Sequence, residues 1–322
     1  MLCMSISLLN INNLSVSFKA DKGKINVVSN LSFDIKKAEV FGIVGESGCG
    51  KSLTALSILR ILPDNAFADG EIIFGDKNLL TLNEDEMRQI RGKDISMIFQ
   101  EPMTSLNPVL TVGYQIAESL ITHFNLSRKE AIDKAIELLR AVKIPTPELR
   151  IKDYPHQMSG GMRQRVMIAM AIACNPSLLI ADEPTTALDV TIQAQILELL
   201  QGLRRQRGMA ILLITHDMGI ISEQADRVAI MYAGRIVELA DVDELFRSPL
   251  HPYTHGLLQS MPTAKGIALK PIAGFVPNPD KLPLGCKFSD RCYLSSDECR
   301  GFEPELVEVF EDHFVRCIKV RQ

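Results

Sequence analysis

The feature that most constrains the fold is a glycine-rich segment in the first fifth of the chain. Residues Gly45–Ser52 read GESGCGKS and fit the pattern GxxxxGK[ST]. The apolar run Val40–Val44 precedes this segment directly, and Leu53–Ile61 follows it with the apolar spacing of a helix. This order of strand, loop and helix is that of a parallel α/β unit. The flanks favour a phosphate-binding loop over a merely flexible glycine turn.

The residue types in this loop suit a nucleoside triphosphate bound with magnesium. Glycines let successive backbone N–H groups converge on phosphate oxygens, and the helix that follows adds its positive end. Lys51 can neutralise the β and γ oxygens, and Ser52 offers a hydroxyl to Mg²⁺. The sequence therefore predicts a nucleotide-binding loop at this position.

Further apolar segments predict the sheet around the loop. Leu178–Ala181 and Ala210–Ile214 are bounded by polar turns, as expected of parallel strands buried on both faces. Nearer the N-terminus, Ser5–Ser17 and Asn26–Ile35 alternate apolar and polar residues around a turn at residues 22–23. We therefore predict an α/β fold of the P-loop NTPase type, with a parallel-sheet core and an N-terminal antiparallel β region.

A mostly helical section separates the loop from the later strands. It runs from about Val112 to Ala173 and contains two amphipathic stretches, Ala131–Val142 and Met162–Ala173. Prolines between these stretches interrupt the helical pattern. This section predicts a helical subdomain at about residues 101–173.

The length and the change of composition along the chain predict two domains. A chain of 322 residues accommodates one large domain and a smaller one. After about Leu250 prolines become frequent, and four cysteines crowd the end of the chain. We predict a nucleotide-binding domain over residues 1–250 and a small cysteine-containing domain over residues 251–322.

Overall composition excludes several classes of protein. The content of hydrophobic residues, 46%, is that of a globular chain and not of a disordered one. The formal net charge of -4 gives no overall field that attracts phosphate backbones, so we expect no nucleic-acid partner. The best apolar stretch, Val166–Cys174, is too short to span a membrane. The first residues lack the basic segment of a secretory signal, so we expect reduced thiols in the cytosol.

Two adjacent carboxylates stand at the end of a predicted buried strand. Asp182 and Glu183 follow the apolar run that starts at Leu178. A divalent cation would explain Asp182, and an attacking water that needs a base would explain Glu183. The alternative is that these side chains only cap a loop. Their position downstream of a phosphate-binding loop favours the catalytic interpretation.

A second exposed helix start is predicted at Ser159, Gly160 and Gly161. These residues precede the amphipathic stretch that begins at Met162. A serine followed by glycines at the N-terminus of a helix can accept an anion. Lys51 and its own loop already form one anion site, so this helix start would be a second one.

Further motifs complete a set that strongly resembles the ABC transporter ATPase family. Besides the segments above, the set contains Gln100, Ala187–Asp189 and His216. The motifs follow the family order from Phe18 to about Ala240. The signature reads MSGGM in place of the commoner LSGGQ, and it keeps the serine and both glycines.

The resemblance implies that two ATPase domains pair head to tail with ATP between them. The phosphate-binding loop of one domain would face the Ser159 element of the other. Gln100 would contact Mg²⁺ and the attacking water and would sense the membrane subunit, and Asp189 would link the two sites across the interface. His216 would hold the γ-phosphate and orient Glu183.

The resemblance also implies a complete set of nucleotide contacts. Phe18 would stack on adenine where the family more often has tyrosine, and the alternative is an ordinary core phenylalanine. The ATP-binding residues would be Phe18, Gly45, Glu46, Ser47, Gly48, Cys49, Gly50, Lys51, Ser52 and Leu53. The partner domain would lend Ser159, Gly160, Gly161 and Asp189. The Mg²⁺ ligands would be Ser52, Gln100 and Asp182.

Three longer segments resemble one branch of the family, the ATPase subunits of dipeptide, oligopeptide and nickel importers. They are Gln100–Pro108, the extended signature Met162–Ala169, and His251–Tyr253 with the leucines that follow. This resemblance implies a second, similar ATPase subunit, two transmembrane permease subunits and an extracytoplasmic substrate-binding protein. The chain would then work at the cytoplasmic face of the cell membrane, with peptides as the expected cargo and nickel as the alternative.

The last four cysteines resemble the cysteine-bearing C-terminal extension of the same branch. Cys286, Cys292, Cys299 and Cys317 have the spacing C-x5-C-x6-C-x17-C. Four thiols in a small cytosolic module suit a metal better than disulfides. We expect a [4Fe-4S] cluster, with tetrahedral zinc or free thiols as the alternatives.

Two other functions are compatible with a nucleotide fold of this kind. A soluble ABC ATPase of DNA repair would insert a long coiled coil before the signature, and one acting in translation would usually carry two cassettes. This chain has only short helical segments before Ser159 and a single cassette. A non-catalytic sensor would not need Glu183 and His216. The sequence therefore favours the importer ATPase.

Overall fold

The computed structural model describes residues 7–20, 23–101, 105–186, 188–261 and 272–320. They fall into two compact units. The helical unit comprises Lys37–Glu39 and Leu82–Leu212, and the sheet unit comprises Ser7–Lys36, Val40–Thr81 and Leu213–Gln322. No helix in these described ranges combines the length and apolar character needed to cross a bilayer.

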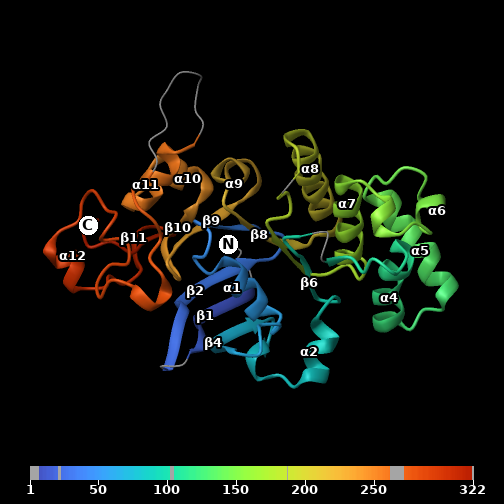
Figure 1. The fold of residues 1–322 in the computed structure, drawn as a ribbon, viewed down its shortest axis with the longest axis horizontal. Helices are drawn as coiled ribbons and strands as arrows, with labels where there is room; N and C mark the ends of the chain where they lie inside the picture. The colour runs from blue at the N-terminus through green and yellow to red at the C-terminus, as the bar shows by residue number, and fades with distance from the viewer. Residues whose placement is uncertain (1–6, 21–22, 102–104, 187, 262–271, 321–322) are drawn as a thin grey trace, which may run out of the picture. The chain divides into compact units, whose positions relative to one another are not determined.

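The first part of the sheet unit is an antiparallel sheet with the strand order β2-β1-β4-β5. Its strands are β1 (Ser7–Ala20), β2 (Gly23–Lys36), β4 (Ala66–Phe74) and β5 (Lys77–Asn78), drawn in the blue range of Figure 1. In β1, Leu9 and Ile11 are buried while Asn10 and Asn12 between and beyond them are more exposed. The alternation buries one face of the sheet and confirms the predicted N-terminal antiparallel region.

The second sheet of this unit carries the glycine-rich loop. Its strands, in sheet order, are β3 (Val40–Val44), β9 (Arg227–Tyr232), β10 (Arg235–Asp241), β12 (His313–Val315) and β11 (Val307–Phe310). β3 is parallel to β9, and the other neighbours are antiparallel. Every residue of β3 and β9 is buried, which explains why both strands are almost continuously apolar.

The helices of the sheet unit are short. They are α1 (Lys51–Ile58), α9 (Met218–Gln224), α10 (Val242–Arg247), α11 (Pro252–Gln259) and α12 (Asp297–Gly301), with 3-10 turns η1 (Leu79–Thr81) and η3 (Pro279–Lys281). β3 and α1 confirm the predicted strand, loop and helix order. Between η3 and β11 the described chain is mostly turns and irregular backbone, as its prolines and glycines predict.

The helical unit confirms the predicted helical section. Its helices are α2 (Glu84–Ile90), α4 (Val112–Phe124), α5 (Arg128–Ala141), α6 (Pro147–Arg150), α7 (Gly160–Ala171) and α8 (Val190–Arg207), with the 3-10 turn η2 (Pro155–Gln157). Figure 1 shows α4, α5 and α7 side by side, and these three helices pack on one another. α5 begins at Arg128, before its apolar stripe, because Ser127 and Glu130 form a capping box there.

Two buried strands complete the helical unit. β6 (Ile95–Ile98) is parallel to β7 (Leu178–Asp182), with Ile95 opposite Leu178. β8 (Ala210–Thr215) begins in this unit and ends in the sheet unit. The apolar runs predicted as strands are thus strands, and the pairs β3–β9 and β6–β7 are parallel as expected.

Candidate functional site

The glycine-rich loop lies between the end of β3 at Val44 and the start of α1 at Lys51. A side chain at Gly45 would place its Cβ 2.1 Å from the Met231 carbonyl oxygen, so only glycine fits there. Gly48 has a φ of +81°, which favours glycine for a different reason. These two constraints hold the backbone in a tight turn that opens into the N-terminus of a helix, which is the geometry of a phosphate cradle.

Lys51 is held within the loop. The residue is 5% exposed, and its Nζ donates to the carbonyl oxygens of Gly45 (2.7 Å) and Glu46 (3.1 Å). Carbonyl acceptors offset part of the cost of burying the ammonium group. The charge therefore stands inside the loop, where a triphosphate would need it.

The other loop residues differ in their exposure. Ser47 and Gly48 are exposed, and Ser52 and Leu53 at the start of α1 are half-buried. Cys49 is fully buried, and burial raises the pKa of its thiol. Cys49 therefore fills space beneath the loop instead of facing solvent.

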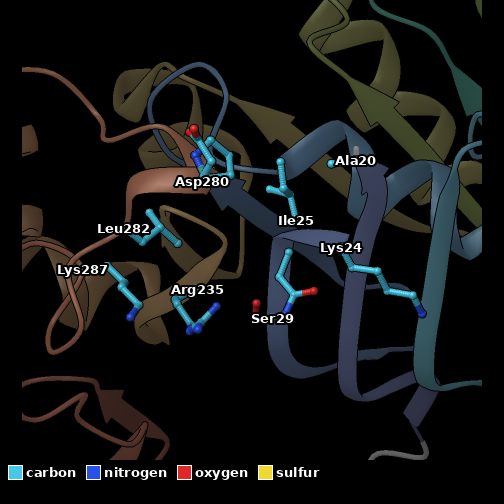
Figure 2. Close-up of a pocket in the computed structure, with 10 residues that line it drawn as sticks. Ala20, Lys24, Ile25, Ser29, Arg235, Asp280, Leu282 and Lys287 are labelled. Atoms are coloured by element: carbon cyan, nitrogen blue, oxygen red, sulfur yellow. The ribbon is translucent and has the colours of Figure 1, made fainter. Parts of the chain in front are cut away.

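Phe18 lies near the end of β1 and is half-buried. In the register of the hairpin it stands opposite Ile25 of β2 and opposite Ala66 of β4. Ile25 also lines a cavity of about 740 Å³ beside the hairpin, which Figure 2 shows in close-up. Phe18 and the glycine-rich loop are not among the residues that line it.

Two of the three cations around this cavity are already paired. Arg235 and Lys287 both contact the carboxylate of Glu303, at 2.6 and 2.9 Å. Figure 2 shows Lys24 extending away from these two side chains. The cavity therefore offers no concentration of uncompensated positive charge among its described residues.

The paired acids stand where the sequence predicts, at the end of β7. Asp182, the last residue of the strand, is 3% exposed, and Glu183 follows with a φ of +46°. The Glu183 Oε2 accepts hydrogen bonds from Gln100 Nε2 at 3.1 Å and from Thr186 Oγ1 at 2.9 Å. The structure thus brings together Gln100 and Glu183, which are 83 positions apart in the chain.

The Ser159 element begins helix α7. Ser159 is the N-cap, and its hydroxyl accepts the Met162 N–H at 3.4 Å. Ser159 and Gly160 are exposed, so the start of this helix lies at the surface. Asp189 is the exposed N-cap of α8, where its carboxylate accepts the Ile192 N–H at 3.0 Å.

His216 follows the last residue of β8 and is exposed. Phe18, the glycine-rich loop and His216 belong to the sheet unit, while Gln100, Asp182, Glu183, Ser159 and Asp189 belong to the helical unit. Ala187 lies outside the described residues.

The four C-terminal cysteines line one small cavity in the sheet unit, together with His251 and Phe288. They carry no disulfides. Burial raises the pKa of the Cys286 thiol to about 11 and also raises the pKa of Cys292 and Cys317. Among the residues the structure describes, no three histidine, cysteine or acidic side chains are arranged to hold a metal ion.

Sequence reasoning missed two residues that hold the loop from the C-terminal region. The Tyr253 hydroxyl accepts the backbone N–H of Glu46 at 3.1 Å. Arg291 Nη1 contacts both carboxylate oxygens of Glu46, at 2.9 and 3.1 Å. Tyr253 belongs to the His-Pro-Tyr segment that marks the branch, which was a usable signal, whereas nothing in the local sequence singles out Arg291.

Comparisons with known proteins agree with this geometry. The family model of the ABC transporter matches residues 28–186, and that of the oligopeptide/dipeptide transporter C-terminal region matches residues 237–299. The chain is 53% identical over 315 residues to the oligopeptide transport ATP-binding protein AppD of Bacillus subtilis, covering 97% of this chain and 96% of that protein. It is 50% identical over 313 residues to the dipeptide transport ATP-binding protein DppD of the same organism, covering 96% and 93%.

A solved structure shares the fold. The dimeric ATP-binding cassette MJ0796, in a post-hydrolysis state bound to ADP and Pi, matches with a TM-score of 0.65 and 29% identity. The match covers 73% of this chain and 98% of that one.

The parallel strands, the glycine-rich loop and the paired acids define an ATPase of the P-loop class. At this level of similarity along almost its whole length, the chain belongs to the ABC transporter family, as an ATP-binding subunit that hydrolyses ATP.

Proposed function

We propose that this chain powers the uptake of oligopeptides or dipeptides through a membrane importer. The observation that carries the proposal is sequence identity of 53% and 50%, over nearly the whole chain, to an oligopeptide and a dipeptide transport ATP-binding protein. The C-terminal region matches as well. Nickel uptake by the same kind of machinery is the second candidate.

Transport measurements decide between these cargoes. Cells that lack this chain are supplied with labelled dipeptide or with labelled nickel, and uptake is compared after the wild-type chain or Glu183→Gln is restored. Peptide uptake that returns only with the wild-type chain supports the proposal. Recovery of nickel uptake alone would replace peptides with nickel.

The proposed assembly contains a second, similar ATPase subunit, two permease subunits and an extracytoplasmic substrate-binding protein. The chain would sit at the cytoplasmic face of the membrane against the permeases. The dimeric state of the similar ATP-binding cassette supports the pairing of ATPase subunits. Exposure of Ser159, Gly160 and Asp189 supports it further, since their backbone and side-chain groups are open to a second molecule.

The proposed reaction is attack of water on the γ-phosphorus of ATP. Glu183 accepts a proton from the water as the new oxygen–phosphorus bond forms, and the bond to the bridging oxygen of ADP breaks. Gln100 and Thr186 hold the carboxylate of Glu183 in place. Lys51, His216 and the Ser159 element of the partner subunit would stabilise the charge on the γ-phosphate.

The residues assigned to magnesium suit that ion. Ser52, Gln100 and Asp182 supply hydroxyl, amide and carboxylate oxygens, which are the donors that Mg²⁺ prefers. Bound with ATP, the ion would neutralise charge on the phosphates. Asp182 is buried at the end of β7, and burying a carboxylate is costly unless it is paired or binds a metal ion. This burial supports its assignment as a magnesium ligand.

We also propose that the four cysteines hold a [4Fe-4S] cluster, with zinc as the alternative. Support comes from the four thiols around one cavity in a chain with no disulfides among its described cysteines. The thiols would have to draw closer than they stand here and lose their protons. Anaerobic purification tests the proposal: brown protein with iron and sulfide supports the cluster, and colourless protein with stoichiometric zinc rejects it.

A further inference from the structure

Glu46, the second residue of the glycine-rich loop, is held at three points. Its backbone N–H donates to Tyr253, its carbonyl oxygen accepts from Lys51, and its carboxylate pairs with Arg291. The two contacts from the C-terminal region span 207 and 245 positions of the chain. The glycines alone permit the turn of the loop. Its backbone conformation therefore does not require contacts with residues so far away in the chain.

Arg291 is fixed firmly enough to position another residue. Its side chain is 6% exposed, and its guanidinium carbon lies 5.7 Å from the ring centre of Tyr232 and 6.0 Å from that of Phe288. Its Nε donates to the Ala273 carbonyl oxygen at 2.8 Å. These contacts leave Nη1 aimed at Glu46, as expected of a stacked and hydrogen-bonded arginine.

The backbone of Arg291 belongs to the four-cysteine region. Its N–H donates to the Phe288 carbonyl oxygen in the turn that follows Cys286, and Cys292 is the next residue in the chain. Tyr253 is also linked to this region through His251, which lines the cavity of the four cysteines. His251 caps α11 by accepting the Tyr253 N–H at 3.0 Å. The two residues that contact Glu46, Tyr253 and Arg291, are therefore both adjacent in the chain or by hydrogen bond to residues that line that cavity.

We propose that Arg291 and Tyr253 are positioning residues for the phosphate-binding loop, through which the four-cysteine region sets the affinity for ATP. The inference rests on the proposed role of the loop in binding ATP. Arg291 neutralises a carboxylate that would otherwise repel the triphosphate, and Tyr253 holds the adjoining backbone. A loop already held in shape loses less conformational freedom when ATP binds.

The decisive measurement is the Kd of the full-length chain for MgATP by titration calorimetry. Arg291→Ala should weaken binding about three- to tenfold, as loss of a charged hydrogen-bonding partner predicts. In a Glu46→Gln background the same change should cost less than about twofold, because no carboxylate is left to neutralise. Arg291→Lys should lose less affinity than Arg291→Ala, because an ammonium can still pair with the Glu46 carboxylate although it lacks the Nε bond to Ala273 that positions the arginine.

Two matched controls separate positioning from general stability. Arg300→Ala removes an exposed arginine of the same region that pairs with Asp297, and it should leave the Kd unchanged. Tyr253→Phe should weaken binding, whereas Tyr293→Phe at an exposed position should not. Melting temperatures are recorded for each variant to check that it folds. If Arg291→Ala does not fold, the Kd values of Arg291→Lys and Glu46→Gln are compared instead.

A final arm tests the link to the cysteines. Cys292→Ser should weaken ATP binding, and it should do so less in the Arg291→Ala background, while Cys174→Ser in the helical unit should have no effect. Equal losses in the wild-type and Glu46→Gln backgrounds, or wild-type affinity in folded Arg291→Ala, would overturn the inference. If the wild-type chain binds ATP no better than Lys51→Ala, the proposed function fails as well.

Discussion

At the scale of single residues, the proposed chemistry depends on the position in which the Glu183 carboxylate is held. Its φ of +46° is uncommon for a residue with a side chain and turns the chain sharply after β7. Gln100 and Thr186 then hold one carboxylate oxygen. The backbone conformation and the two side-chain contacts together fix the direction of the carboxylate, as the proposed role of Glu183 as a base needs.

Glu183→Gln should keep ATP binding and lose turnover. The amide retains the shape and can still contact neighbours, but it cannot accept the proton of water, so we expect ATP hydrolysis to fall by roughly 10²- to 10⁴-fold. Phosphate release is measured in the assembled transporter, with Glu198→Gln on the exposed face of α8 as the control. Turnover at the wild-type rate in Glu183→Gln would remove Glu183 as the base.

Lys51→Ala should act on binding itself. Removal of the buried ammonium takes the Lys51 hydrogen bonds from the carbonyl oxygens of Gly45 and Glu46 and leaves the phosphates without this cation. We expect MgATP affinity to drop by at least about tenfold in calorimetry. Lys152→Ala, at an exposed position of the helical unit, is the control, and an unchanged Kd for Lys51→Ala would contradict the role of the loop.

At the scale of elements, two helix starts with the same local design are predicted to differ in function. Ser159 caps α7 and Ser127 caps α5, each through its hydroxyl. The Ser159 end is exposed and carries two glycines, Gly160 and Gly161, whereas α5 has a capping box with Glu130. Only the first is suited to the close approach of an anion from another subunit.

Ser159→Ala and Ser127→Ala form a matched pair. Each should cost about 0.5–2 kcal/mol of stability through loss of an N-cap, measured as the free energy of unfolding in urea. ATP turnover of the assembled transporter should fall strongly for Ser159→Ala and stay near wild type for Ser127→Ala. Equal turnover in the two variants would mean that Ser159 only caps its helix.

The junction of β10 and α11 should make stability depend on pH. Glu238 is fully buried, and hydrogen bonds from His313 and from two backbone N–H groups lower its pKa although burial opposes this. Burial lowers the pKa of His251 from an ordinary 6.5 to about 4. Between pH 6.5 and about pH 4, His251 binds a proton in the unfolded chain but not in the folded chain, so stability falls as the pH falls.

From pH 7 to pH 5 this difference amounts to on the order of 2 kcal/mol from His251. Urea midpoints at the two pH values measure it. His251→Asn should show a smaller decrease, since asparagine can cap α11 without titrating. His156→Asn, at an exposed position, should keep the wild-type decrease, and a wild-type decrease in His251→Asn would assign the effect to other groups.

The elements were largely predictable, and the long-range contacts were not. The end of β3 at Val44 follows from Gly45, because glycine alone fits beside the Met231 carbonyl. The start of α5 before its apolar stripe follows from the Ser127 cap, which periodicity alone does not reveal. Pairing of Glu46 with Arg291 depends on how chain segments 245 positions apart pack, and no local pattern encodes it.

At the scale of the whole molecule, the groups proposed to contact the nucleotide of a second subunit are exposed on a single chain. Ser159, Gly160 and Asp189 are exposed, and Val190 beside them is 83% exposed. Exposed polar and apolar groups at the starts of α7 and α8 suit a surface that a second subunit covers. The catalytic unit proposed here is therefore the pair of ATPase subunits.

Sedimentation velocity of Glu183→Gln mixed with the second ATPase subunit tests this central claim most directly. Since hydrolysis is blocked at the site that uses Glu183, MgATP should hold the two subunits in a closed pair that sediments as a dimer. The same mixture without nucleotide should sediment as monomers, as should one in which Glu183→Gln also carries Ser159→Glu. Sedimentation that is the same with and without MgATP would contradict the claim that ATP is bound between two subunits.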